Sequence, residues 1–135
     1  MIGVVVVTHG QVSTELVNAA EAIVGDLPRF AAVTIGWHED VQDARNEIAA
    51  AIDRLQDGDG VLVLTDMFGG TPSNLAISVM ESGNVEVIAG MNLPMLIKLA
   101  GLRDSHGLLA VAREMREHGR NAIWVASDLL RSQQT

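Results

Sequence analysis

The sequence predicts an α/β fold: an open, mainly parallel sheet with helices on both faces and an added antiparallel strand near the C-terminal end. Short apolar runs alternate along the chain with amphipathic windows, which is the pattern of βαβ units. Apolar residues make up 48% of the chain and aromatic residues only 3%. The core is therefore expected to consist of aliphatic side chains, as in sheets that are covered on both sides. With 135 residues, the chain fits one domain; we assign 1–130 to it and 131–135 to a frayed tail.

Five apolar runs are expected to form strands: residues 2–7, 31–35, 60–65, 85–89 and 122–126. The last run follows Gly119-Arg120-Asn121, which we interpret as a tight turn after a helix. Because a parallel strand needs a long crossover, so short a connection favours an antiparallel final strand.

The windows between these runs carry apolar residues at helical spacing. The first window, 12–23, ends before Gly25, and the second, 41–55, follows Asp40 as an N-cap. In a third helix, Thr71 is expected to cap the first turn and Pro72 to occupy the first helical position. A fourth helix has its inner face between residues 108 and 115.

Charge and composition exclude several classes of protein. The formal net charge of −8 argues against nucleic-acid binding and favours a basic protein partner. The chain has no cysteine, so it forms no disulfide and no thiolate metal site. The apolar runs are far shorter than the roughly 20 residues of a spanning helix, and no basic leader precedes them. We therefore expect a cytoplasmic protein with no direct membrane insertion.

His9 and Asp66 follow the first and third predicted strands. Taken singly, His9 fits a polar residue that makes a hydrogen bond in a loop as well as it fits a functional residue. Asp66 alone also fits a turn or helix cap. If the two strands are neighbours, both side chains emerge at a switch point of the sheet, where open α/β folds place their sites. A carboxylate that accepts from one ring N–H fixes the tautomer and the ring plane, which leaves the other nitrogen free as a nucleophile.

Gly69, Gly70 and Thr71 lead from the third strand into a helix. Free backbone amides at such a turn suit phosphoryl oxygens, and the Thr71 hydroxyl adds a donor; the glycines alone also fit a simple turn. No P-loop lysine and no GxGxxG segment is present. We therefore expect no nucleotide cofactor and a phosphoryl donor other than ATP.

Four further residues are candidates for the walls of the same cleft: His38, Phe68, Asn92 and Pro94. His38 also fits an exposed loop. A metal site made by His9, Asp66 and His38 lacks any closely spaced ligand pair, so no metal is predicted.

Three stretches carry a family resemblance: VVVVTHG at 4–10, TDMFGGTPSN at 65–74 and AGMNLPML at 89–96. In this order they resemble the enzyme IIA component of the mannose-type sugar phosphotransferase system, and the similarity extends over nearly the whole chain. The resemblance implies a phosphotransferase in which His9 accepts a phosphoryl group from the carrier protein HPr and passes it to a histidine of a IIB partner. It also implies that Asp66 orients His9 and that the turn through Thr71 helps to hold the phosphate.

The resemblance further implies a sheet of order 2-1-3-4, with a C-terminal strand exchanged between the subunits of a homodimer. Many family members have serine where this chain has Thr71, a change that keeps the hydroxyl. No IIB segment follows in this sequence, so the acceptor is expected to be a separate IIB protein. The alternative is a regulatory phosphorelay module whose His9 phosphorylation state controls binding to another protein. The phosphotransfer subunit of a dihydroxyacetone kinase shares the fold, but residues 69–72 look more like the mannose type.

Overall fold

The four strands of the computed structural model, which describes residues 1–37, 39–80, 84–103 and 107–133, form one parallel sheet. They are β1 (Gly3–His9), β2 (Phe30–Ile35), β3 (Val61–Thr65) and β4 (Val85–Ala89), in the order β2-β1-β3-β4. This confirms the predicted fold class and strand order. Because β1 lies between β2 and β3, the loops that follow these three strands meet at one edge of the sheet.

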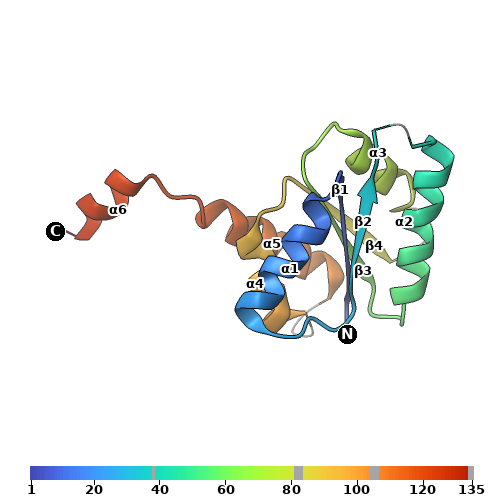
Figure 1. Ribbon diagram of the computed structural model, residues 1–135. Helices are drawn as coiled ribbons and strands as arrows, with labels where there is room; N and C mark the ends of the chain where they lie inside the picture. The colour runs from blue at the N-terminus through green and yellow to red at the C-terminus, as the bar shows by residue number, and fades with distance from the viewer. Residues whose placement is uncertain (38, 81–83, 104–106, 134–135) are drawn as a thin grey trace.

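Helices cover both faces of the sheet, as predicted (Figure 1). One face carries α1 (Val12–Val24), α4 (Leu93–Leu102) and α5 (Leu108–Asn121), and the other carries α2 (Val41–Leu55) and α3 (Thr71–Ser78). The side chains of β1 alternate between the two cores and are fully buried from 4 to 7, which explains the unbroken valine run. None of the helices in the described ranges has both the length and the apolar character needed to cross a bilayer.

Helix α2 begins as its sequence predicts. The Asp40 carboxylate accepts hydrogen bonds from the N–H groups of Gln42 and Asp43, at 2.9 and 3.2 Å. Such a cap typically stabilises a helix by about 1 kcal/mol. The buried stripe of α2, including Ile48 and Ile52, then packs against the sheet.

Two other helices differ from the sequence prediction. In α3 the extended residue Gly70 is the N-cap and Thr71 is already helical, so the predicted capping by the Thr71 side chain is wrong. The extended backbone of Gly70 fills the position that we assigned to Thr71. Helix α4 was not predicted, because a short apolar run that contains a proline does not distinguish a helix from a loop. Asn92 caps α4 by accepting from the Met95 N–H.

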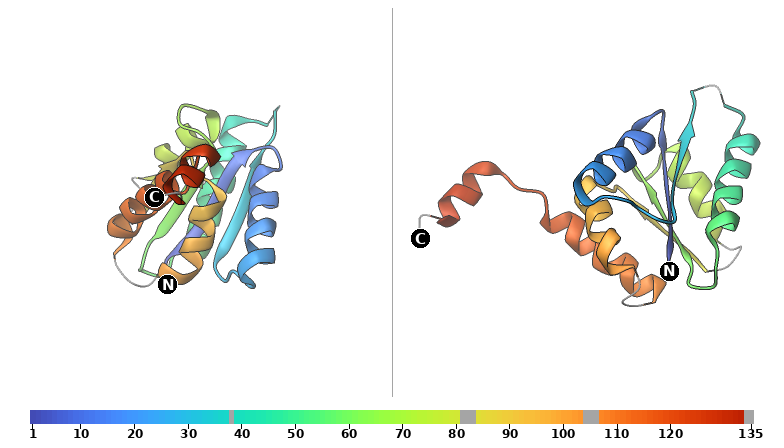
Figure 2. Two further views of the ribbon diagram at one scale, coloured as in Figure 1. Left: turned by 90° about the vertical axis from the view of Figure 1, so that its left-hand side faces the viewer. Right: turned by 60° about the horizontal axis from the view of Figure 1, so that its bottom comes forward.

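The predicted fifth strand is absent from the described residues. Helix α5 continues through 119–121, where a turn was expected, and 122–125 then lead into α6 (Ala126–Gln133). Figures 1 and 2 show α6 projecting away from the body of the molecule. A strand needs a neighbouring strand for its hydrogen bonds, and in this single chain residues 122–125 have none. Residues 131–133, assigned to a frayed tail, lie in α6, and 134–135 lie outside the described residues.

The packing of α4 leads to a stability prediction. Leu99 is fully buried between α4 and the sheet, so Leu99→Ala should lower the free energy of unfolding by about 2–5 kcal/mol. Ile23→Ala removes the same number of carbons from an α1 side chain that is 59% exposed and should cost less than about 1 kcal/mol. Urea unfolding of both variants measures the difference. Equal losses would contradict the placement of α4 in the core.

Candidate functional site

The candidate site lies where β1, β2 and β3 end. His9 is the last residue of β1 and is paired in register with Ile35, the last residue of β2. Asp66 follows β3 directly. A hollow of about 270 Å³ opens beside the His9 ring. Its lining comes from the ends of β1 and β2, the connection from β2 to α2, and the starts of α2 and α3: His9, Ile35, Gly36, Trp37, Glu39, Val41, Ala44 and Thr71.

The structure brings His9 and Asp66 together, as the sequence predicts. Asp66 Oδ2 lies 2.8 Å from His9 Nδ1 and also accepts a hydrogen bond from the His9 backbone N–H at 3.0 Å. The other oxygen, Oδ1, accepts from the Met67 N–H at 3.0 Å. Because an ionised carboxylate only accepts, the proton between the two side chains belongs to Nδ1. This leaves Nε2 as the unprotonated nitrogen of the neutral ring.

The bonds around Asp66 also act on its charge. Partial burial favours the neutral acid, but the hydrogen bonds from the His9 ring and the His9 N–H, the charge of His9 and the Met67 N–H outweigh this effect. The pKa of Asp66 therefore lies below its usual range. A folded-state pKa below the unfolded value means that this carboxylate stabilises the fold above the unfolded pKa, about 3.9. The stabilisation is lost as the pH falls through the lower folded-state pKa.

The glycine turn lies against the outer edge of the His9 ring. A Cβ atom on Gly70 would be 2.9 Å from His9 Cε1 and 3.5 Å from His9 Nε2, so only glycine permits this approach. Gly69 has φ +87°, a left-handed conformation that glycine adopts without strain. The turn thus brings backbone next to Nε2, the nitrogen that faces away from Asp66.

The amide groups of this turn are not equally available. Gly69 N–H donates to Ser73 Oγ at 3.0 Å, and the same hydroxyl donates to Gly70 O at 3.0 Å. Thr71 is the first residue of α3, so its N–H has no acceptor within the helix. Of the predicted phosphate-binding amides, that of Gly69 is therefore occupied. Ser73 is not among the site residues that the sequence predicts; its only signal in the sequence is a hydroxyl three residues after Gly70.

A buried pair of hydroxyls fastens the start of α1 next to His9. Thr8 Oγ1 accepts from the Ser13 N–H at 2.6 Å, and Ser13 Oγ donates to Val33 O at 3.0 Å. Both side chains are fully buried. These bonds connect β1, β2 and α1 directly beneath the candidate site.

The other predicted wall residues are placed differently. The Asn92 side chain accepts from the Met95 N–H at 3.3 Å and donates to Gly119 O at 2.9 Å, so it joins α4 to α5. Neither Asn92 nor Pro94 lines the hollow. Phe68 stands on the turn and is 76% exposed, and His38 lies outside the described residues. Trp37, which lines the hollow and is 90% exposed, is not among the site residues that the sequence predicts.

Within the described part of the chain, no three His, Cys, Asp or Glu side chains are grouped so that they could hold a metal ion. The described residues of the site place an imidazole beside a carboxylate and against a glycine turn.

Comparison with known proteins gives a consistent result. The family model EIIA-man, described as "PTS system fructose IIA component", matches residues 3–115. The fructose-specific EIIA component of Bacillus subtilis (strain 168) is 29% identical over 136 residues, which cover 100% of this chain and 93% of the relative. The mannose-specific EIIAB component of Escherichia coli (strain K12) is 32% identical over 127 residues; the match covers 90% of this chain but only 39% of that protein.

Solved structures agree with the sequence comparison. The crystal structure of the PTS IIA protein associated with the fucose utilization operon from Streptococcus pneumoniae has a TM-score of 0.84 and 27% sequence identity. The match covers 95% of each chain.

The His9–Asp66 contact predicts the tautomer of the ring. In the neutral state, ¹⁵N NMR should show His9 protonated at Nδ1 and unprotonated at Nε2. In Asp66→Asn this preference should weaken, because an amide can donate to the ring as well as accept from it. A wild-type ring protonated at Nε2 would contradict the geometry of the site.

Proposed function

Because this chain belongs to the EIIA-man family of sugar phosphotransferase-system IIA components, we propose that His9 accepts a phosphoryl group from the phosphohistidine of an HPr-type donor and passes it to a histidine of a IIB-type partner. The family accounts for the coarser role, phosphoryl transfer in sugar uptake. The residues and partners named here are the proposal.

The observation that carries this proposal is the 2.8 Å contact between Asp66 Oδ2 and His9 Nδ1. It directs the lone pair of Nε2 outward, where the side chain remains 39% exposed. An incoming phosphohistidine can then approach in line with Nε2.

The transfer step balances without a cofactor. The Nε2 lone pair forms a bond to phosphorus as the N–P bond of the donor histidine breaks, and that electron pair returns to the donor ring. The proton on Nδ1 stays in place, so the phosphorylated ring carries a positive charge that the Asp66 carboxylate offsets. Transfer to the IIB histidine repeats the same exchange in the forward direction.

The transferred group needs donors for its oxygens. The N–H groups of Gly70 and Thr71 and the Thr71 hydroxyl are the proposed donors, since they belong to the turn against Nε2 and to the start of α3. The Gly69 amide, predicted from sequence for the same role, is left out of the proposal because it donates to Ser73.

The surroundings of His9 suit a protein partner better than a small molecule. Trp37 is 90% exposed, Phe68 76% and Val41 61%, so apolar side chains stand around the site without cover. Exposed apolar side chains gathered in one place are typical of sites that bind other proteins.

Charge points to a basic partner. Carboxylates gather at the start of α2, where burial and the neighbouring Glu39 and Asp43 raise the pKa of Glu47. A positively charged surface on the partner would relieve this repulsion and speed the encounter.

The first test is phosphorylation by phospho-HPr. The wild-type chain should take up one acid-labile phosphate and His9→Ala none. Asp66→Asn should remain folded but accept phosphate roughly 10- to 100-fold more slowly, because the ring loses its fixed tautomer. Asp53→Asn removes an exposed carboxylate from α2 and should transfer at the wild-type rate.

Uptake of phosphate by His9→Ala would exclude His9 as the acceptor, and an unchanged rate in Asp66→Asn would exclude the role of Asp66. The fate of the phosphate separates the two forms of the function. Loss of phosphate to a IIB protein supports transport. A phosphorylated chain that instead changes its affinity for another protein supports the regulatory module.

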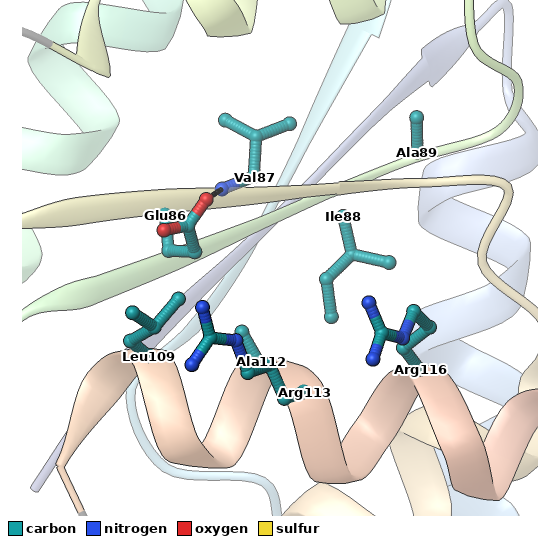
Figure 3. Close-up of a pocket in the computed structure, with 8 residues that line it drawn as sticks. All are labelled: Glu86, Val87, Ile88, Ala89, Leu109, Ala112, Arg113 and Arg116. Atoms are coloured by element: carbon teal, nitrogen blue, oxygen red, sulfur yellow. Dashed lines mark hydrogen bonds between the residues drawn. The ribbon is translucent and has the colours of Figure 1, made fainter.

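We further propose a homodimer in which residues 122–126 of one copy add an antiparallel strand to β4 of the other. β4 is an edge strand whose outer side is unpaired in this chain. Between β4 and α5 lies a groove, shown in Figure 3, with β4 backbone along one side and α5 side chains along the other. It is lined by Glu86, Val87, Ile88, Ala89, Leu109, Ala112, Arg113 and Arg116.

The projecting C-terminal segment has the composition to fill such a groove. Ile123, Trp124 and Val125 are 74%, 63% and 65% exposed, an unusual state for three successive large apolar residues. Strand addition would satisfy the free edge of β4 and bury these side chains together.

Trp124→Asp should therefore convert a dimer to a monomer in sedimentation equilibrium, because it places a charge in the proposed interface. Trp37→Asp changes a tryptophan that is even more exposed, at 90%, and that follows β2 at the edge of the sheet opposite β4, so it should leave the dimer intact. A wild-type protein that is monomeric at high concentration would contradict strand exchange.

A further inference from the structure

Ser73 stands out among the residues near His9 because both capacities of its hydroxyl are used within the turn that faces the ring. Oγ accepts from the Gly69 N–H and donates to Gly70 O, each at 3.0 Å. The side chain is fully buried, so it cannot touch an incoming phosphoryl group itself. We propose that Ser73 is a positioning residue for phosphoryl transfer, an inference that rests on the proposed role of His9.

The first effect of Ser73 is on the direction of the Thr71 amide. Gly70 O accepts from Ser73 Oγ and also from the Asn74 N–H at 3.0 Å. In a planar trans peptide the carbonyl and the following N–H point in opposite directions. Holding Gly70 O toward α3 therefore turns the Thr71 N–H away from the helix, out of its N-terminal end.

The second effect is on the distance between the turn and His9. Gly70 packs so closely on the ring that a Cβ would lie 2.9 Å from Cε1. The two bonds to Ser73 hold Gly69 and Gly70 in this position. Without them, the turn could relax away from Nε2 at little cost, because both residues are glycines.

The third effect is on the number of donors. Ser73 keeps the Gly69 N–H away from the site, so the transferred group meets the amides of Gly70 and Thr71 but not that of Gly69. The hydroxyl thus selects which amides of the glycine turn serve the phosphoryl group.

The test compares Ser73→Ala, Ser73→Thr and Ser78→Ala. Ser73→Ala removes both hydrogen bonds, and Ser73→Thr restores the hydroxyl. Ser78→Ala is the matched control: it removes a hydroxyl that donates to Leu75 O at the far end of the same helix. Transfer from phospho-HPr to each variant is measured over a series of HPr concentrations.

Ser73→Ala should lower the maximal transfer rate roughly tenfold, because small displacements of positioned groups have large effects on rate. The half-saturating HPr concentration should not change, since Ser73 is buried and cannot contact the donor. Ser73→Thr should recover most of the rate, and Ser78→Ala should match the wild type. A Ser73→Ala maximal rate equal to that of Ser78→Ala would overturn the inference.

A measurement on the wild type keeps the test independent of how the variants fold. On phosphorylation of ¹⁵N-labelled protein, the Thr71 amide resonance should move strongly and the Gly69 resonance should not. A Gly69 shift as large as that of Thr71 would refute the selection of amides by Ser73. A wild-type chain that takes up no phosphate would overturn the proposed function and this inference together, whereas normal uptake with no Ser73 effect would overturn this inference alone.

Discussion

The candidate site depends on the register between β1 and β3. Val7 is paired with Thr65. His9 comes two residues after Val7 and Asp66 one residue after Thr65, so the two side chains lie next to each other at the end of the sheet. A shift of one residue would exchange the two faces of β1 and bring the fully buried Thr8 out toward the site. The four valines at 4–7 fill both cores and would fit either register. Gly3 excludes the shift, because a Cβ atom at its position would lie 2.7 Å from Leu55 Cβ.

Asp66 fixes the tautomer and the orientation of the His9 ring, which this register places beside it. One of its oxygens accepts from both the backbone and the ring of His9, and the other from Met67. Three donors converge on one carboxylate, so its position is determined before any partner arrives. Such preorganisation is the main way in which a protein lowers the barrier of a transfer reaction without a metal or cofactor.

The sequence predicts the pairing of His9 with Asp66 because it follows from strand ends alone, once the two strands are neighbours. The hydrogen bonds of Ser73 could not be predicted, since they depend on the conformation of Gly69 and Gly70 rather than on any spacing. The predicted start of α3 is one residue too late for a related reason. An extended glycine can also serve as the N-cap, so Thr71 is already helical. The strand predicted at 122–126 is missing for a different reason. A strand is defined by its partner, and this segment has none within the described part of its own chain.

A phosphoryl relay also limits how tightly its site can hold the group. Donors that bind the phosphorylated ring more strongly than the transition state deepen the intermediate and slow its onward transfer. On the proposed function, the occupied Gly69 amide and the open hollow beside His9 both keep that binding modest. On the same proposal, the exposed Trp37 and Phe68 would contact the partner protein and not the phosphoryl group. A fixed nucleophile, few phosphate donors and an uncovered apolar rim are together consistent with a group that stays on His9 only briefly.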